Sequence, residues 1–543
     1  MKFLVYWLSV VSAIASVSAA DASVYDARLF SQVPVRDWIA GDRDRYLADV
    51  RAAGVDCVLA SFGDMYAFGA QRAAFFDSLA QEIRFFERAG VPVMVWTDTL
   101  GYGDVRTGTA DGKARFGGAQ PLLGLEGGSN GAVCPLDPKM RAYACETMSD
   151  IAKAGARFIL VDDDFVQSAR GRLGCACPRH LARVSAKLGR AVTREEVLAS
   201  FAGAPNPVRS AFVDVTGEVA MEFAGQMRAA VDVVNPGIVM GLCLSYSHWD
   251  VEGAEMDDLL GVLAGPGRRK IVRISGAPYW SDGRFHHAGL EGIVEFVRMQ
   301  AEWTRGTGWK VFDENDPYPR KIAQVPAWRC ELYDKATIAD GLMARHKYML
   351  CYGPKRTEPG YLEAHLANRS EDARLREIFA NTEPAGVYVP NPRRRIREET
   401  LPVPRRCEAE LVGLASFPMA STVLVHCGIP VRHDPSPKSY TLDRAQLGVD
   451  LWSVDFATFP REQVRDNVLL AAERAGHPVP VYAETKSRRV YLLLRYDACK
   501  CRHVALLENF GEDAADVRLV TRDKAGSVEV KALAPHSWRV VVL

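Results

Sequence analysis

The sequence has no excess of charge of either sign and no motif of a nucleotide-dependent enzyme. Its 543 residues include 67 Lys and Arg and 67 Asp and Glu, so the formal net charge is zero. Nucleic-acid-binding domains usually carry a basic excess, so we expect no nucleic-acid partner. A G-x-S-x-G elbow, a P-loop and a dinucleotide-binding fingerprint with its acidic residue are absent. We therefore expect no organic cofactor, no hydride transfer and no nucleotide hydrolysis.

Long apolar segments are scarce, and one short apolar run stands at the beginning of the sequence. Lys2 precedes apolar residues 3–17, and the small residues Ser18, Ala19 and Ala20 follow them. This order is typical of a secretory signal peptide. No later segment approaches the roughly 18 apolar residues that a membrane-spanning helix needs. The sequence therefore predicts a signal peptide over residues 1–20 and an exported protein, periplasmic or extracellular, without a membrane span.

Cysteine is too sparse for a small disulfide scaffold, although an exported protein can hold disulfides. The sequence has 12 cysteines. Most stand singly among apolar residues and are expected to be buried thiols, as at Cys57, Cys243, Cys330 and Cys351. Two local clusters differ from these, one at Cys175 and Cys177 and one at Cys499 and Cys501.

Short apolar runs alternate with longer amphipathic segments between about residues 25 and 355. This alternation indicates parallel βα units. Eight strands are predicted, over residues 27–32, 55–61, 91–97, 157–162, 238–245, 270–275, 309–314 and 347–352. Helices are predicted between them, for example over residues 72–88, 139–153, 209–234, 290–305 and 335–344. Eight regular units favour a closed (β/α)8 TIM barrel over an open doubly wound sheet.

The pattern changes after residue 355, and a proline-rich junction follows. Residues 385–485 predict a small α/β domain with a parallel sheet, with helices near 408–427 and 461–475 and strands over 429–433, 451–456 and 479–483. From residue 489 strands alternate with turns. Residues 489–543 therefore predict a small β-sandwich domain, with strands over 490–496, 503–509, 516–521, 528–532 and 538–543.

Acidic residues follow two of the predicted barrel strands, at the end where TIM barrels carry their chemistry. The fourth strand ends in Asp162, Asp163 and Asp164, and the seventh ends in Asp313 and Glu314. These strands lie on opposite sides of an eight-stranded barrel, so one carboxyl from each could flank a glycosidic bond. One would donate a proton, and the other would attack or activate water. A loop cap or a cation site is the alternative interpretation of the acidic run.

Aromatic side chains gather at the same strand ends, where sugar rings could stack on them. Trp96 ends the third predicted strand, Tyr246 and Trp249 follow the fifth, and Trp280 follows the sixth. Carboxylates beside such rings can bind sugar hydroxyls. The predicted substrate-binding residues are Asp162, Trp96, Asp98, Tyr246, Trp249 and Trp280.

A Cys/His cluster follows the acidic run. Cys175, Cys177 and His180 stand in C-x-C-x-x-H spacing, and Cys134 precedes a predicted helix upstream. Three thiolates and one imidazole could complete a tetrahedral zinc site with all four positions filled. Free thiols or disulfides are the alternatives, although a bridge between Cys175 and Cys177 would be strained. The sequence thus allows a structural zinc ion.

In their order along the chain, these elements resemble glycoside hydrolase family 42, the β-galactosidases. That family has a Cys-Pro helix start, an Asp-Asn-Glu-Tyr end of strand four and a C-x-C-x-x-C element. Here Cys134-Pro135, residues 162–165 and residues 175–180 match them. The departures from the pattern include Asp163 in place of Asn, Asp164 in place of Glu and His180 in place of the last Cys.

The resemblance implies roles for individual residues. Asp164 takes the position of the acid/base, Glu314 that of the nucleophile, and Asp163 that of the neighbouring amide. The four zinc ligands would be Cys134, Cys175, Cys177 and His180. It also implies that residues 385–485 form a flavodoxin-like trimerisation domain, so we expect a homo-oligomer and favour a trimer.

The expected function is an exported, retaining glycoside hydrolase similar to the β-galactosidases, with a carbohydrate substrate. Two alternatives stay open. One is an α-galactosidase-type hydrolase with an Asp nucleophile on strand four and Asp282 as the acid. The other is a non-catalytic carbohydrate-binding barrel.

Overall fold

The computed structural model describes residues 24–35, 42–61, 70–100, 110–129, 131–168, 172–282, 289–350, 357–393, 396–401, 418–451, 453–522 and 526–543. The predicted signal peptide, Cys351 and the first half of the helix predicted over 408–427 lie outside these residues, as does the side chain of Asp282.

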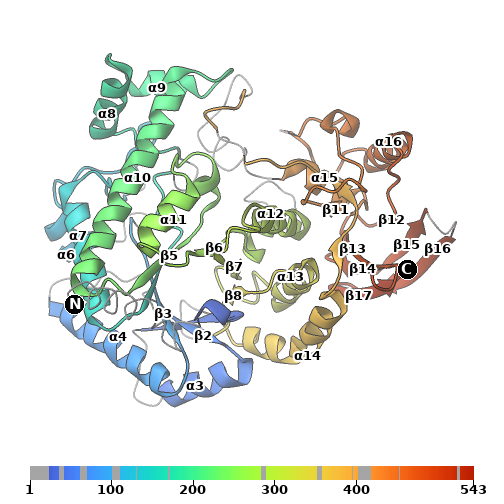
Figure 1. Ribbon diagram of the computed structural model, residues 1–543, viewed down its shortest axis with the longest axis horizontal. Helices are drawn as coiled ribbons and strands as arrows, with labels where there is room; N and C mark the ends of the chain where they lie inside the picture. Colours follow the sequence, from blue (N-terminus) through green and yellow to red (C-terminus); the bar gives the residue numbers. More distant parts are fainter. Residues whose placement is uncertain are drawn as a thin grey trace, which may run out of the picture.

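Eight parallel strands close a barrel in chain order (Figure 1), as predicted. They are β1 (Leu29–Pro34), β2 (Cys57–Ser61), β3 (Val93–Thr97), β4 (Phe158–Val161), β5 (Val239–Cys243), β6 (Ile271–Arg273), β7 (Lys310–Asn315) and β8 (Arg345–Lys347). Pairing between β1 and β8 completes the ring. The eighth strand lies two residues earlier than predicted and ends at Lys347, and the apolar residues after it are buried beyond the strand.

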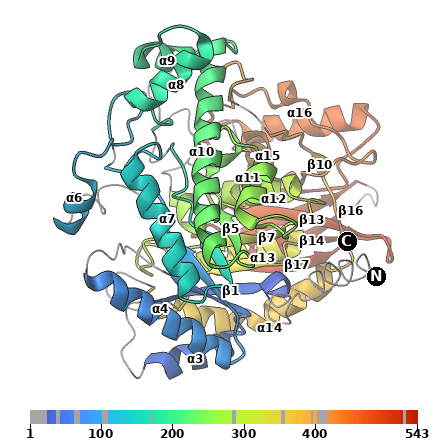
Figure 2. The same ribbon diagram turned by 60° about the vertical axis from the view of Figure 1, so that its left-hand side comes forward.

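Helices surround the barrel (Figures 1 and 2). Those that follow the strands include α3 (Asp42–Ala53), α4 (Ala70–Arg88), α7 (Pro138–Lys153), α10 (Pro207–Val234), α11 (Met256–Ala264), α12 (Gly289–Trp303), α13 (Ala327–Asp340) and α14 (Tyr361–Phe379). Asp137 caps α7 and Asn206 caps α10, and each is followed by a proline in the first helical turn. Helix α13 begins eight residues before the predicted start, and Gly341 ends it in the left-handed conformation at φ 99°. None of the described helices is both long and apolar enough to cross a membrane.

Short helices of the described residues are inserted between the barrel units. Helix α6 (Ala110–Phe116) precedes α7, and α8 (Pro178–Leu188) and α9 (Arg194–Ser200) stand between β4 and α10. Figure 2 shows α8 and α9 at one end of the long helix α10. The Cys/His cluster lies at the beginning of α8, since Cys177 is its N-cap residue.

The barrel interior consists of two layers that follow from strand alternation. Inward side chains of the lower layer are apolar, and Phe30 stacks on Phe312 with ring centroids 4.4 Å apart. Side chains two residues further along a strand point to the same side. Two residues beyond Phe312 stands Glu314, and two beyond Ile271 stands Arg273. The upper layer, at the C-terminal ends of the strands, is therefore polar and charged.

The chain after the barrel forms three further sheets. Strands β10 (Val387–Tyr388) and β11 (Val431–Arg432) pair in parallel beside α15 (Met419–His426) and α16 (Arg461–Arg474). The C-terminal sandwich has sheets of order β12-β15-β16 and β17-β14-β13-β9. Its strands are β9 (Glu383–Pro384), β12 (Val481–Glu484), β13 (Val490–Asp497), β14 (Arg502–Asn509), β15 (Ala515–Thr521), β16 (Gly526–Leu533) and β17 (Ser537–Val542).

Two strand predictions for the α/β segment need correction. The strand predicted over residues 451–456 is wrong, because the described residues there form turns. The strand predicted over 479–483 exists as β12, but it pairs antiparallel with β15 and so belongs to the sandwich. The parallel sheet of this segment therefore has two strands, β10 and β11.

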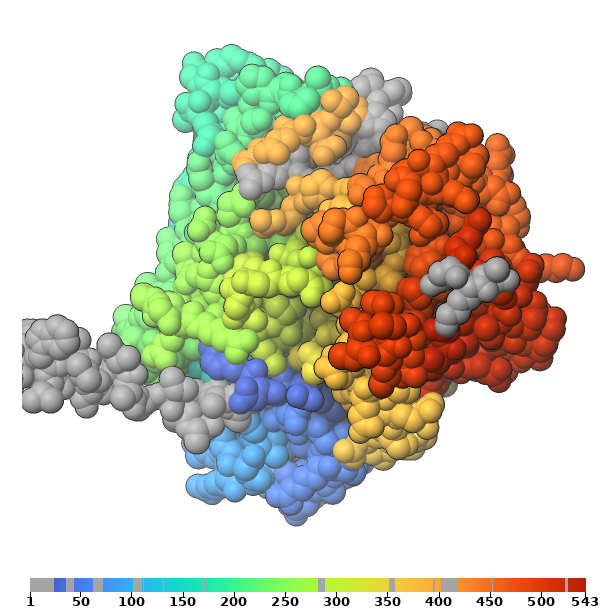
Figure 3. Space-filling view, turned by 45° about the vertical axis from the view of Figure 1, so that its right-hand side comes forward, coloured from blue at the N-terminus to red at the C-terminus, as the bar shows by residue number. Residues whose placement is uncertain are grey.

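A buried charge network joins the C-terminal segments to the barrel, on the side that Figure 3 shows in yellow, orange and red. Glu295 of α12 accepts hydrogen bonds from Arg298 (2.6 Å) and from the Tyr491 hydroxyl (2.7 Å), and lies 2.9 Å from His433. Arg298 also contacts Asp340 at 2.9 Å. Burial alone would raise the pKa of Glu295, but the attraction of Arg298 and His433 prevails and lowers it to about 2.

We predict that Glu295→Gln destabilises the protein at neutral pH by on the order of 3 kcal/mol, because Arg298 loses a buried counter-charge. A carboxyl with a lowered folded pKa contributes stability above its ordinary pKa of 4.5, and that contribution is lost as pH falls toward about 2. The difference in thermal midpoint between variant and wild type should therefore shrink over this range.

The matched control is Glu371→Gln, since Glu371 and Arg374 form a surface pair with side chains 43% and 56% exposed. Surface pairs contribute about 0–1 kcal/mol, so this variant should melt like the wild type. Equal midpoints for both variants at every pH would contradict the assigned role of Glu295.

Candidate active site

Arg273, the last residue of β6, lies among three carboxylates at the C-terminal ends of the strands, here called the barrel mouth. Its Nη2 atom is 3.5 Å from Asp162 Oδ1, 3.6 Å from Asp163 Oδ2 and 3.3 Å from Glu314 Oε1. Its side chain is 1% exposed. The structure thus brings the acidic ends of β4 and β7 together around one buried guanidinium.

A tyrosine completes the contacts of this group. Arg273 Nη1 donates to the Tyr348 hydroxyl at 2.8 Å, and that hydroxyl donates to Glu314 Oε1 at 3.4 Å. Glu314 Oε2 is buried and has no hydrogen-bond partner among the described residues. One oxygen of Glu314 is therefore held by the protein, and the other has no hydrogen-bond partner among the described residues.

Asp163 and Glu314 are close enough to act on one bond. Both contact the same Nη2 atom, so Asp163 Oδ2 and Glu314 Oε1 are at most 6.9 Å apart, the sum of the two distances of 3.6 Å and 3.3 Å. Retaining glycosidases place their carboxyls about 5–5.5 Å apart and inverting ones about 6.5–9.5 Å apart. An oxygen–oxygen distance of at most 6.9 Å includes the whole retaining range and only the shortest part of the inverting range.

The surplus of negative charge raises the pKa values of this pair. Burial, opposed by Arg273 and assisted by Asp316, raises the pKa of Asp163 to about 6. Burial, opposed by Arg273 and assisted by Asp163 and Asp316, raises the pKa of Glu314 to about 8. Burial and mutual repulsion thus both oppose the doubly ionised form of the pair. Such a pair can provide an acid and an ionised partner at the same pH.

Asp164 has a different environment from its neighbours. Its Oδ1 and Oδ2 accept from the Thr99 amide at 3.0 Å and 2.7 Å, and its Oδ1 accepts from the Thr99 hydroxyl at 3.0 Å. Asp164 is 1% exposed, whereas the Asp163 side chain is 20% exposed. These bonds tie the loop after β4 to the end of β3. The structure therefore gives Asp164 the geometry of an anchor and gives Asp163 access to the barrel mouth.

The predicted aromatic residues divide into two groups. Trp96 lies beside the charged cluster, with its ring centroid 5.7 Å from the Arg273 guanidinium, and Tyr246 and Trp280 pack edge to face at 5.7 Å. Trp249 instead donates its indole N–H to Gln300 at 2.8 Å, and it is about as buried as Trp280, at 6% against 5% exposed. Asp98 is half-buried and directly precedes Thr99.

Sequence reasoning missed two members of the site, Arg273 and Tyr348. An isolated arginine inside the apolar strand predicted over residues 270–275 was the available signal, since an unpaired buried guanidinium is costly. Nothing comparable marked Tyr348, because tyrosine is common in buried strands and its partners lie far away in sequence.

The four residues of the Cys/His cluster meet as predicted. Their ligand atoms all lie within 4.8 Å of one another, and all four side chains are buried. Cys134 Sγ is 3.7 Å from Cys177 Sγ, and His180 Nδ1 is 3.5 Å and 3.3 Å from these two sulfurs. A tetrahedron with ligand distances of about 2.3 Å for sulfur and 2.0–2.1 Å for nitrogen has edges of roughly 3.8 Å and 3.6 Å. The cluster could therefore hold a metal ion.

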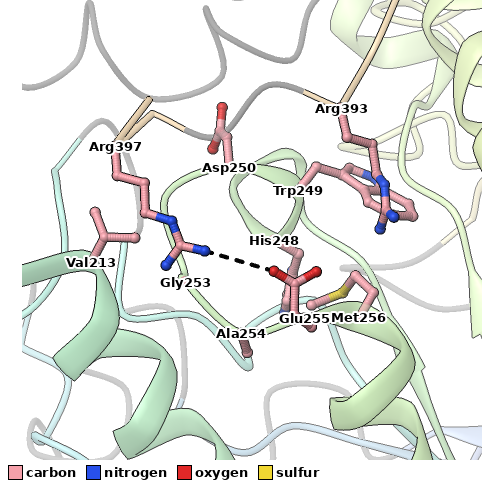
Figure 4. A pocket seen from close by; sticks show the side chains of 10 residues that line it. All are labelled: Val213, His248, Trp249, Asp250, Gly253, Ala254, Glu255, Met256, Arg393 and Arg397. Carbon is pink, nitrogen blue, oxygen red and sulfur yellow. Dashed lines mark ion pairs between the residues drawn. The ribbon is translucent and has the colours of Figure 1, made fainter. Parts of the chain in front are cut away.

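A pocket lies outside this site, between the loop after β5 and the segment that follows β10 (Figure 4). Its wall includes Trp249 and Arg393, and an ion pair of 3.8 Å joins Arg397 to Glu255. Neither Asp163 nor Glu314 lines it. The pocket thus explains the surroundings of Trp249 but takes no part in the carboxylate cluster.

No protein-family model matches this chain, and no curated protein matches its sequence. Solved structures do match. The cold-adapted β-galactosidase from Rahnella sp. R3 is 11% identical with a TM-score of 0.57, and the β-galactosidase from Bacillus circulans sp. alkalophilus is 10% identical with a TM-score of 0.58. Alpha-L-fucosidase isoenzyme 2 from Paenibacillus thiaminolyticus is 11% identical with a TM-score of 0.53.

In each case the match covers 95% of this chain and 98% of the other chain. The likeness therefore extends from the barrel through the C-terminal domains. At these identities it shows the fold, and it confirms the predicted TIM barrel with additional C-terminal domains.

Proposed function

We propose that the protein is a glycoside hydrolase whose catalytic pair is Asp163 and Glu314. The observation that carries this proposal is the pair itself, two carboxyls from opposite sides of the barrel that contact the same Nη2 atom of Arg273. The aromatic rings of Trp96, Tyr246 and Trp280 provide surfaces for a sugar, and Asp162 provides a further acceptor for sugar hydroxyls. The likeness to two β-galactosidases and a fucosidase supports the same reaction class.

The roles are assigned from the burial of the two carboxyls, since the Glu314 side chain is 5% exposed and that of Asp163 is 20% exposed. The more deeply buried Glu314 is assigned the proton of the pair, which it donates to the leaving group. Asp163, ionised and partly exposed, attacks the anomeric carbon as the bond to the leaving group breaks, and a covalent glycosyl-enzyme forms. Glu314, now ionised, takes a proton from a water molecule that attacks the same carbon, which releases the sugar and frees Asp163. The separation of the two groups favours this retaining course. Arg273 stabilises the negative charge that the pair carries throughout. Asp164 is thus no longer assigned as the acid. Glu314, which the resemblance implied to be the nucleophile, takes the role of the acid instead.

The proposed reaction is hydrolysis of an O-glycosyl bond, and β-galactosides are the first substrates to test. Export and assembly into a trimer stay predictions from the sequence. The following experiments distinguish this proposal from two alternatives. One is a non-catalytic carbohydrate-binding barrel. The other is the β-galactosidase-like assignment, with Asp164 as the acid and Glu314 as the nucleophile.

Glu314→Gln should slow hydrolysis of an aryl glycoside with a poor leaving group by about 10²–10⁴-fold, because only a poor leaving group needs the proton. The same variant should form the glycosyl-enzyme from a dinitrophenyl glycoside nearly as fast as the wild type, so its kcat/KM for that substrate should change little. Asp163→Asn should abolish turnover of both substrates, because it removes the nucleophile. Steady-state kcat/KM with matched aryl glycosides measures all of this.

The matched control is Asp164→Asn, which removes charge from the same loop but not from the catalytic pair. It should affect both substrates alike. If Asp163→Asn, and not Glu314→Gln, gives the leaving-group dependence, the two roles are exchanged. If Asp164→Asn gives it, the acid is Asp164. A wild type that binds sugars but turns over no glycoside would refute the hydrolase proposal.

The pH profile of kcat/KM should be bell-shaped. Activity is lost below about pH 6, where Asp163 takes up a proton, and above about pH 8, where Glu314 loses its proton. In Glu314→Gln the alkaline limb should disappear with an activated substrate, while the acid limb persists. Profiles that are flat between pH 5 and pH 9 would contradict the shared proton.

We also propose that the Cys/His cluster binds a structural zinc ion through Cys134, Cys175, Cys177 and His180. The three sulfurs and one nitrogen suit zinc, and four protein ligands leave no position for a substrate. Bound zinc would supply folding energy rather than Lewis-acid chemistry. The ligands join the start of α8 to the segment before α7, so the ion would brace the chain on both sides of β4.

Elemental analysis should find about one zinc per chain. Cys177→Ser should lower both the zinc content and the thermal midpoint, since the remaining three ligands bind more weakly. Cys499→Ser, which changes an exposed thiol in a distant hairpin, should leave both unchanged. A fully folded protein without metal, with its thiols free or disulfide-bonded, would exclude the zinc site.

A further inference from the structure

We propose that Gln167 is a positioning residue that couples the Cys/His metal site to the catalytic loop, residues 162–168. The expected effect on catalysis rests on the proposed function, and the coupling itself rests on the geometry of the Cys/His cluster. Gln167 stands four residues after Asp163 and is 2% exposed.

The orientation of the Gln167 amide is determined by its two partners. Its Nε2 donates to the Thr216 carbonyl at 2.8 Å, so its Oε1 must face His180 Nε2 at 2.7 Å. A carbonyl oxygen only accepts, and therefore His180 Nε2 carries the proton. The unprotonated Nδ1 then faces Cys134 and Cys177, which is the tautomer that a metal ligand requires.

The backbone around Gln167 is held from the opposite side. Glu252 accepts from the amides of Gln167 at 2.9 Å and Ser168 at 2.7 Å. His248 Nε2 donates to the Phe165 carbonyl at 3.0 Å. With Thr99 holding Asp164, the catalytic loop is fixed at several points. Gln167 differs from the other residues of the loop because its side chain also accepts a hydrogen bond from His180, a proposed zinc ligand.

The coupling depends on the residue at position 180. A cysteine there would present a single sulfur to the metal and no N–H to the loop. The histidine provides two nitrogens, one toward the cluster and one toward Gln167. The replacement of the last cysteine by His180 therefore creates a connection between metal site and active site that a fourth thiolate could not make.

The decisive variants are His180→Cys and Gln167→Leu. His180→Cys keeps four zinc ligands and should retain about one zinc per chain, while kcat falls about tenfold and KM changes little. Gln167→Leu should give the same loss of kcat, and the double variant should lose no more than either one. Gln167→Glu keeps an acceptor for His180 Nε2 and should restore kcat toward the wild-type value.

Hydrogen exchange provides a readout that does not depend on activity. In both single variants, and in wild type stripped of zinc by a chelator, the amides of residues 165–168 should exchange faster. Amides of α16 should exchange as in the wild type. The wild-type comparison needs no substitution, so a variant that fails to fold does not remove the test.

Unchanged exchange at residues 165–168 after zinc removal, or a zinc-loaded His180→Cys or Gln167→Leu with full kcat, would overturn the coupling. So would a wild type that binds no metal. If no glycoside is hydrolysed but exchange responds to zinc as expected, the coupling holds and the hydrolase proposal fails.

Discussion

The barrel mouth depends on one buried guanidinium. Three carboxylates, from Asp162, Asp163 and Glu314, lie within 3.6 Å of Arg273, and desolvated charges at that density would not remain ionised without it. One cation does not balance three anions, and the remaining repulsion together with burial lifts the pKa values of the pair above the acidic range. The same interaction therefore makes the site foldable and leaves it holding a proton. Strand alternation makes this possible, since Arg273 and Glu314 stand two residues beyond inward apolar residues of β6 and β7.

The barrel could be predicted because its pattern is local. Each βα unit repeats an apolar run and an amphipathic helix, and most strand ends fall within two residues of the prediction. The C-terminal region was harder, because the choice of strand partner is not local. Residues 481–484 form a strand as their pattern indicates, but only tertiary packing pairs them with β15 rather than with the parallel sheet. The residues predicted as a strand over 451–456 show that short apolar runs also occur in packed turns.

The site was predictable in composition but not in detail. The acidic strand ends and the C-x-C-x-x-H spacing named residues that the structure brings together, because strand ends converge in a barrel and the spacing suits a helix start. Choosing among Asp162, Asp163 and Asp164 was not possible, since three successive residues differ only in direction and in partners. Thr99, 65 positions away from Asp164, makes that choice by occupying its carboxylate. The hydrogen bond from the Trp249 indole to Gln300, 51 positions away, could likewise not be foreseen from the sequence.

These contacts explain how the departures from the β-galactosidase pattern belong together. A side chain one methylene shorter at position 164 stays close to the backbone, where the Thr99 amide and hydroxyl capture it. The carboxyl that faces Glu314 is then the one at position 163, where the family has an amide. A loop whose acidic residue has shifted by one position needs its path defined on the far side as well, and the bond from His180 to Gln167 supplies that restraint. The loop after β4 is thus held at one end by Thr99, through Asp164, and at the other by His180, through Gln167.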